Sequence, residues 1–285
     1  MKGICELYKI NTELRESHIY PKFVIKQTKR SGSKYFRKIT DPNKRHQDGL
    51  KLHLLSEQAE QDFSKREKWF AENIFVPYLS GKKTLTYNEN LYYFAISFLW
   101  RILVVNLKTI TNIKDLWHYE DLLKVEIEWR NYLINGTLPK DHKKTYILFT
   151  DRIEENNTIL KGVDLYFTRV MDATIVDNPT HTSLMIYGKF SRFIFWSVLK
   201  EYGKEESLTE VEINPKGGLF KIPQKIDYFP IQSFWGNRIQ EISSYPLPNE
   251  KQQDIILKEI LKNPEEFWNS DVGKSLFNDK FNLDK

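Results

Sequence analysis

Three residue types near the start of the chain could together hydrolyse a phosphodiester bond. His18 stands in the run Ser17-His18-Ile19-Tyr20-Pro21-Lys22-Phe23, Asn43 follows in a turn-rich segment, and Glu60 lies near the start of a predicted helix. A neutral imidazole can deprotonate water, an amide can orient that imidazole, and a carboxylate can hold a divalent cation at the scissile phosphate. The residue types fit this chemistry, while their spacing alone leaves the assignment open.

The basic charge of the chain is concentrated in the same region. The net charge is +5, and residues 1–60 carry 13 Lys or Arg against 7 Asp or Glu, a local net of +6. Clustered cations favour phosphate binding because they release counterions, although a solvated basic face without a partner fits the charge equally well. The candidate contacts to nucleic-acid phosphates are Lys22, Lys26, Lys29, Arg30, Lys34, Arg37, Lys38, Lys44 and Arg45.

The first eighty residues are expected to form a small module. They contain turn signals such as Ser31-Gly32-Ser33, and they run into a stretch with helical spacing from Glu57 to Asn73. We therefore predict a module of short strands and loops followed by a helix over residues 1–80, and a larger domain over residues 81–285.

The larger domain is predicted to mix helices and strands, which makes the whole chain α+β. Helical spacing between Tyr87 and Ile134 predicts two helices. Strands are predicted at Thr145 to Thr150, Gly162 to Val176 and Leu184 to Trp196, although the last run also fits a helix that continues through Val198 to Tyr202. A hairpin around Lys216-Gly217-Gly218 is expected within Thr209 to Pro223, followed by helices at Glu250 to Lys262 and from Pro264 through Trp268.

The sequence predicts a cytoplasmic protein without membrane contact. The segment from Leu91 to Leu107 comes nearest to a membrane-spanning helix, but Arg101 and Asn106 interrupt it, so a buried helix is expected. The stretch from Met1 to Lys9 lacks the apolar run of a signal peptide. Cys5 is the only cysteine, so no intramolecular disulfide can form, which fits a reducing compartment.

Four segments of the first quarter of the chain form a recognisable set: Cys5-Glu6-Leu7-Tyr8, Ser17-His18-Ile19-Tyr20-Pro21-Lys22-Phe23, Asn43-Lys44-Arg45-His46-Gln47-Asp48-Gly49 and Leu54-Leu55-Ser56-Glu57-Gln58-Ala59-Glu60. Together they resemble bacterial HNH endonuclease-like proteins. The resemblance implies a ββα-metal-like module braced by two CxxC knuckles. It makes His18 the candidate general base and Asn43 the candidate central asparagine, and it places Glu60 where the helix usually offers a metal-binding histidine.

The chain departs from that family pattern at the zinc knuckles. Of the four expected ligands only Cys5 is present, and Tyr8, Ser56 and Ala59 occupy the other three positions. Because a structural zinc site needs four N or S ligands, no structural zinc is predicted. Mg²⁺ or Mn²⁺ is the metal expected at the active site, since carboxylates suit these ions; its predicted ligands are Glu60 and Asp48.

Two functions remain open on the sequence. The first is a metal-dependent HNH-type endonuclease that cleaves DNA or RNA, and analogy extends this to defence against phage or mobile DNA. The second is a catalytically inactive HNH-like module that binds nucleic acid or a protein partner. Retention of His18 favours the first function, and loss of three cysteines favours the second.

Overall fold

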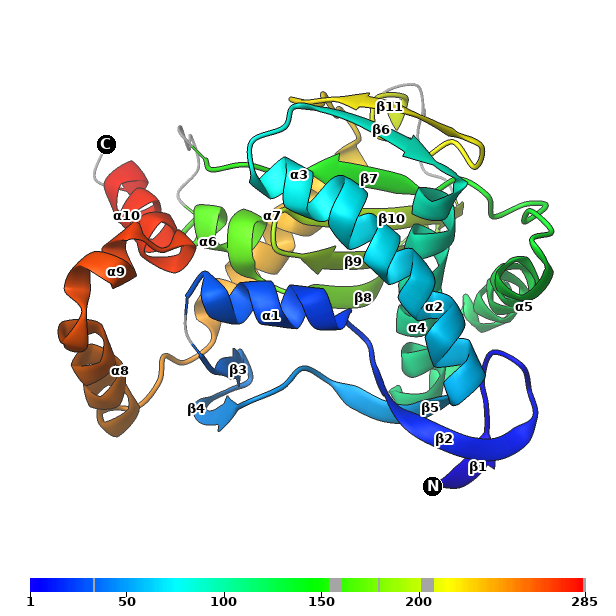
Figure 1. The fold of residues 1–285 in the computed structure, drawn as a ribbon, viewed down its shortest axis with the longest axis horizontal. Coiled ribbons are helices and arrows are strands. Elements are labelled where there is room, and N and C mark those ends of the chain that lie inside the picture. The colour runs from blue at the N-terminus through cyan, green and yellow to red at the C-terminus, as the bar shows by residue number, and fades with distance from the viewer. Residues whose placement is uncertain (33, 154–159, 179, 201–207, 284–285) are drawn as a thin grey trace.

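The computed structural model describes residues 1–32, 34–153, 160–178, 180–200 and 208–283 of the chain (Figure 1). The first elements are β1 (Lys2–Ile4), β2 (Asn11–His18), α1 (Lys22–Arg30), β3 (Phe36–Lys38), β4 (Asp41–His46), β5 (Lys51–Ser56), α2 (Glu57–Phe70), a π-helical turn (Ala71–Phe75), α3 (Val76–Leu79) and β6 (Thr84–Asn88).

The remaining elements are α4 (Glu89–Thr109), a short 3₁₀ turn (Ile113–Asp115), α5 (Tyr119–Asn135), β7 (Tyr146–Phe149), α6 (Val163–Arg169), β8 (Asp172–Asp177), β9 (Leu184–Phe190), β10 (Phe193–Lys200), β11 (Gly217–Lys221), α7 (Phe229–Ser244), α8 (Glu250–Lys262), α9 (Pro264–Asn269) and α10 (Asp271–Leu283). Helices and several small sheets follow one another along the chain, so the predicted α+β class is confirmed.

A four-stranded antiparallel sheet, in the order β7-β10-β9-β8, forms the centre of the molecule. Successive side chains of a strand point to opposite faces, and here both faces are buried. One face carries Ile186, Phe193 and Phe195 and packs against the first hydrophobic cluster, which includes α4. The other carries Tyr187 and Trp196, and α7 covers it.

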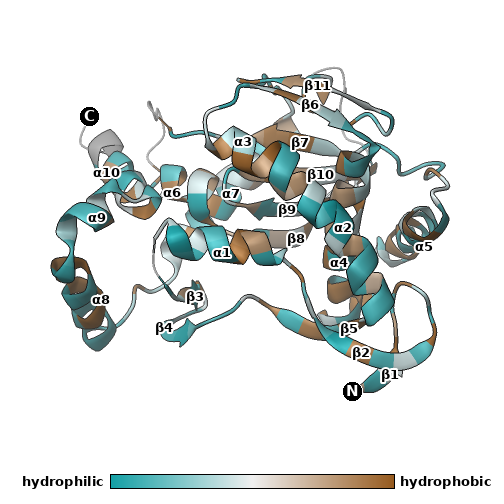
Figure 2. Ribbon diagram, in the orientation of Figure 1, coloured by the Kyte–Doolittle hydropathy of each residue, from teal (hydrophilic) through white to brown (hydrophobic). Residues whose placement is uncertain are grey.

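The predicted buried helix is α4, and it packs on the first face of the sheet. It is long and apolar enough to cross a bilayer by length and composition, but 72% of its most apolar window is buried inside the protein. Figure 2 shows apolar residues concentrated on α4 and the central strands. Among the described residues α4 is the one helix with this property, and it serves as the core helix of the fold.

Aromatic packing joins the first eighty residues to the rest of the chain. The rings of Phe70 in α2 and Phe94 in α4 stack with centroids 4.1 Å apart, and Phe23 of α1 lies 6.4 Å from Phe190 of β9. Buried residues on both sides of the predicted boundary at residue 80 thus belong to one hydrophobic cluster. The division at residue 80 stays a prediction, and the packing across it is continuous.

Helix α1 was expected as part of a strand-and-loop region, and the structure makes it a helix. It begins after Pro21, whose fixed φ suits the start of a helix. Val24 and Ile25 are buried on its inner side, while its polar side bears the basic residues. The helix forms because its apolar and basic residues alternate with helical spacing, so that burial of one side stabilises it.

Two predictions in the second half of the chain are wrong. The predicted strand from Gly162 to Val176 is instead α6 followed by β8, because the Asp279 carboxylate accepts hydrogen bonds from the backbone N–H groups of Asp164 and Leu165. The predicted hairpin around Lys216-Gly217-Gly218 does not form, because β11 pairs with β6. Helices α7 and α10 also form without having been predicted.

The second face of the sheet contains a buried polar network. Arg238 of α7 holds the Asp172 carboxylate through two hydrogen bonds of 2.9 and 2.7 Å, and the Tyr166 hydroxyl donates to the same carboxylate. Lys189 is fully buried beside them and donates to the carbonyl oxygens of Val170 and Ser191. Burial lowers the pKa of Lys189 to about 7, although nearby Asp172 opposes that shift.

We predict that the free energy of unfolding rises with pH above about 7 because of Lys189. The folded chain releases this proton near pH 7, whereas an unfolded lysine holds it until its ordinary pKa of 10.5. The unfolded state therefore binds more protons in this window, and stability should increase by about 1 kcal/mol per pH unit. Denaturant titrations between about pH 7 and pH 9 measure this, and Lys189→Met should flatten the rise. An equally steep rise in that variant would contradict the assignment.

Candidate functional site

The candidate site is built on the antiparallel pair β2–β5 and on helix α2. His18 ends β2 opposite Lys51, and Leu14 at the other end of the pair lies opposite Ser56. Ser56 then caps α2, because its hydroxyl oxygen accepts a hydrogen bond from the backbone N–H of Ala59. Two paired strands lead directly into a helix, and residues 19–50 form an insertion between the strands.

His18 is paired with Asp48 at the open end of these strands. The His18 Nε2 atom lies 3.2 Å from Asp48 Oδ1, and 12% of the His18 side chain is exposed. Asp48 also contacts Lys51 Nζ at 2.6 Å and accepts a hydrogen bond from the backbone N–H of Gly49. Partial burial alone would raise the pKa of Asp48, but these donors and His18 lower it to about 2. Asp48 is therefore ionised and can orient the imidazole.

Asn43 lies elsewhere in the insertion and makes a different contact. Its Oδ1 atom accepts a hydrogen bond from the backbone N–H of Asn249, just before α8. No contact joins Asn43 to His18 among the residues that the structure describes. Of Asn43 and Asp48, it is Asp48 that contacts His18 in the described parts of the chain.

Glu67 of α2, and not Glu60, is connected to His18 through Arg101. Arg101 of α4 is buried, and its NH1 atom donates to the His18 carbonyl oxygen at 3.1 Å and pairs with Glu67 at 2.8 Å. Glu60 lies in the first turn of α2, seven residues before Glu67, which corresponds to about 10 Å along a helix. The sequence missed Glu67 and Arg101, because only the packing of α2 against α4 brings them together.

The predicted divalent metal site is not assembled by these side chains. No group of three or more His, Cys, Asp or Glu side chains that could hold a metal ion occurs in the described parts of the chain. Asp48 is already bound by Lys51 and Gly49, and Glu67 by Arg101. The donor set around His18 therefore does not fit a bound Mg²⁺ or Mn²⁺, and we derive no chemical step through one.

Of the four positions where the resemblance implies zinc ligands, Cys5, Ser56 and Ala59 lie close together. The Cys5 thiol donates to Ser56 Oγ at 3.4 Å, and the Ser56 backbone N–H donates to Cys5 Sγ at 3.3 Å. Ala59 is buried next to Ser56 in the first turn of α2, and the Tyr8 hydroxyl donates to Asp62 at 2.6 Å. Hydrogen bonds thus join Cys5, from the first implied knuckle, to Ser56, from the second. A single thiolate does not make a tetrahedral zinc site.

Most of the predicted phosphate contacts are exposed, and two are engaged within the chain. Arg37 contacts Gln252, and Arg45 forms an ion pair with Glu259 at 3.0 Å. The others make no ion pair within the described parts of the chain, and Lys29 lies over the ring of Phe36. Six of the nine side chains are exposed: Lys22, Lys26, Arg30, Lys34, Lys38 and Lys44.

Comparison with protein-family models, with curated proteins and with solved structures finds no match to this chain. The likeness to HNH endonuclease-like proteins therefore remains a resemblance of residues and motifs.

We predict that the knuckle region needs no metal for stability. Removing the Tyr8 hydroxyl in Tyr8→Phe deletes the hydrogen bond to Asp62 Oδ2 and leaves Asp62 with the longer contact from Lys65, which should lower the free energy of unfolding by about 1 kcal/mol. Excess chelator should leave the melting temperature of the wild-type chain unchanged. Thermal unfolding with and without EDTA measures both effects, and a clear drop on chelation would show that a metal supports the fold.

Proposed function

We propose that this protein binds nucleic acid through the basic surface formed by α1 and the β3–β4 pair, beside an HNH-like module that does not assemble a metal group. The proposal rests on the distribution of charged residues in this part of the chain. Residues 22–38 contain seven Lys or Arg and no Asp or Glu. A run of cations without interleaved acids retains its full attraction for a polyanion.

Helix α1 arranges four of these cations along one side. Lys22, Lys26, Lys29 and Arg30 follow one another at steps of four, three and one residues, which keeps them within one face of a helix of 3.6 residues per turn. No acidic residue occurs in this helix. The result is a short row of positive charges suited to a line of phosphates.

The row is held rigidly by contacts on the other side of α1. The Phe23 ring lies 4.9 Å from that of Phe75, and Val24 is fully buried. At the end of the helix, Arg169 donates to the carbonyl oxygens of Thr28 and Ser31, which are among the last unpaired acceptors of α1. A fixed helix loses little conformational freedom when its basic side binds a ligand.

We predict salt-sensitive binding of duplex DNA or structured RNA. The triple variant Lys22→Ala/Lys26→Ala/Arg30→Ala should weaken binding at least about tenfold at low salt and lower the slope of log K against log salt by about 2. The control Lys65→Ala/Lys68→Ala/Lys82→Ala removes the same charge from exposed positions outside α1. Fluorescence anisotropy across a salt series measures both quantities. Equal losses in the two variants would indicate a general charge effect and contradict the assignment to α1.

Hydrolysis of the bound nucleic acid is a second candidate function, and the His18–Asp48 pair favours it. A histidine within hydrogen-bond reach of an ionised carboxylate is a general base with an orienting partner. In this mechanism His18 takes a proton from the attacking water, and Asp48 stabilises the imidazolium that forms. The role in defence against phage or mobile DNA rests on the resemblance and belongs to this candidate.

We predict that any cleavage of plasmid DNA or structured RNA is lost in His18→Ala and reduced at least about a hundredfold in Asp48→Asn. Asn43→Ala should retain activity, because Asn43 contacts Asn249 and not His18. Incubation with EDTA, Mg²⁺, Mn²⁺ or Ni²⁺ in parallel measures the metal requirement. No cleavage by the wild-type chain under any of these conditions would leave binding as the function.

A further inference from the structure

The C-terminal helices occupy part of the basic surface. Gln252 Oε1 accepts hydrogen bonds of 3.2 and 3.1 Å from the two terminal nitrogens of Arg37, and Glu259 pairs with Arg45. The backbone N–H of Asn249 donates to Asn43 between them. All three contacts come from α8 or the residue before it, and all fall on β3 and β4, next to the basic row of α1 (Figure 1).

The contacts of α8 with β3 and β4 that join side chains of the described residues are polar. None of the residues of α8 is buried, and the apolar side chains Leu257 and Leu261 are 53% and 62% exposed. The ion pair of Arg45 with Glu259 joins partly exposed side chains, and such pairs contribute little to stability. Because α8 contains no buried residue, its release would remove none of its own side chains from the core, and it would break few strong interactions.

The contact with Glu259 also leaves two hydrogen-bond donors of Arg45 without an acceptor among the described residues. Its guanidinium lies over the Tyr35 ring, and its NH1 atom pairs with Glu259, but its buried Nε and NH2 atoms make no hydrogen bond with the described residues. Buried donors without acceptors are unfavourable. A phosphate group, which accepts two parallel hydrogen bonds from a guanidinium, would satisfy Arg45 better than the single carboxylate contact does.

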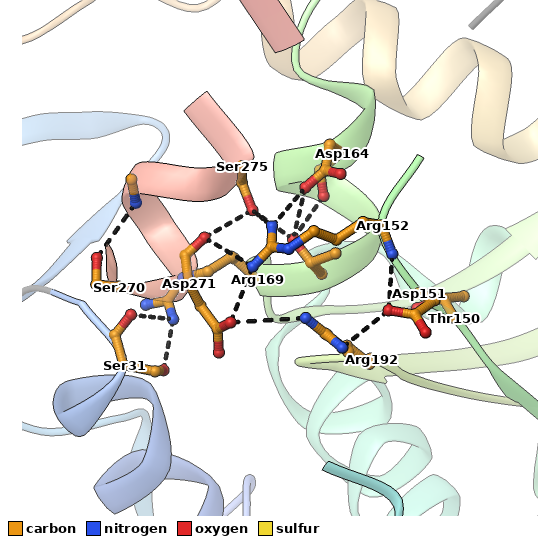
Figure 3. A network of polar contacts seen from close by, with 12 residues as sticks. Ser31, Thr150, Asp151, Arg152, Asp164, Arg169, Arg192, Ser270, Asp271 and Ser275 are labelled. Carbon is orange, nitrogen blue, oxygen red and sulfur yellow. Dashed lines mark hydrogen bonds and ion pairs between the residues drawn. The ribbon is translucent and has the colours of Figure 1, made fainter. Parts of the chain in front are cut away.

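The end of the C-terminal segment is anchored far more firmly. Asp271 at the start of α10 contacts Arg152 at 2.9 Å and Arg192 at 3.5 Å, and Ser275 lies 2.8 Å from the Thr168 hydroxyl (Figure 3). Asp279 caps α6, as described above. Helix α10 can thus stay in place while α8 moves, so α8 behaves as a tethered element beside the basic surface.

We infer that α8 is an autoinhibitory element that competes with nucleic-acid phosphates for Arg37 and Arg45. The inference rests on the proposed nucleic-acid binding and adds a regulated subsite to it. When α8 is in place, the exposed cations of α1 remain available and the two arginines are occupied. Release of α8 extends the binding surface from α1 across β3 and β4.

The test is the affinity of the full chain for a duplex DNA and a structured RNA, with and without the α8 contacts. Gln252→Ala/Glu259→Ala removes the two side chains that hold Arg37 and Arg45. It should bind at least about threefold more tightly than wild type, with a steeper salt slope by about 1 to 2, because up to two further phosphates are neutralised. The control Gln253→Ala/Asp254→Ala makes the same change of charge on α8 without touching either arginine.

Equal affinities and slopes for variant, control and wild type would overturn the autoinhibition while leaving nucleic-acid binding intact. Absence of binding by all three proteins would overturn both proposals. Hydrogen exchange of the unmodified chain gives a second readout. Saturating DNA should speed exchange of α8 amides and leave α10 protected, and unchanged α8 protection would count against the competition.

Discussion

The close approach of α4 to the central sheet is the constraint on which the rest of the structure depends. A side chain at Gly188 of β9 would place its Cβ atom 2.5 Å from Ile102 and 2.6 Å from Phe98, so any larger residue would force these α4 side chains to move. Around it, aromatic rings from α1, α2, α4 and β9 meet edge to face or stack. Arg101 lies between Phe98 and Ile102 in sequence, and the position of α4 therefore sets the position of the guanidinium that joins His18 to Glu67.

Hydrogen bonds and packing hold together the region around Cys5, Tyr8, Ser56 and Ala59. Cys5 and Ser56 exchange hydrogen bonds at the place where the resemblance implies ligands from two knuckles. Leu7, Leu54 and Phe63 belong to the same buried cluster as α4. These strands and α2 therefore share one hydrophobic core with α4, and burial in that core stabilises their arrangement.

Polar contacts act in two distinct ways in this protein. Those of Asp172, Asp164 and Asp279 are buried or joined to backbone groups, so losing them would leave unsatisfied polar groups inside the fold. Those of Gln252 and Glu259 lie at the surface, where water or a ligand can replace them. Arginine contacts thus join α7 to a buried carboxylate, whereas the arginine contacts of α8 lie at the surface.

The sequence by itself determined the elements whose signal is local. The α+β class, α4 and α5, the strand β7, and the helices α8 and α9 follow from periodicity and from helix-ending residues, and the immediate neighbours of His18 mark it as a candidate. The run from Leu184 to Trp196 has a strand pattern, but only the structure divides it into β9 and β10. Only the tertiary structure decided that α6 is a helix, that β11 pairs with β6, and that Asp48 and Arg101 rather than Asn43 meet His18. Each of these depends on a partner far away in the chain, and local patterns carry no information on which distant segment packs nearby.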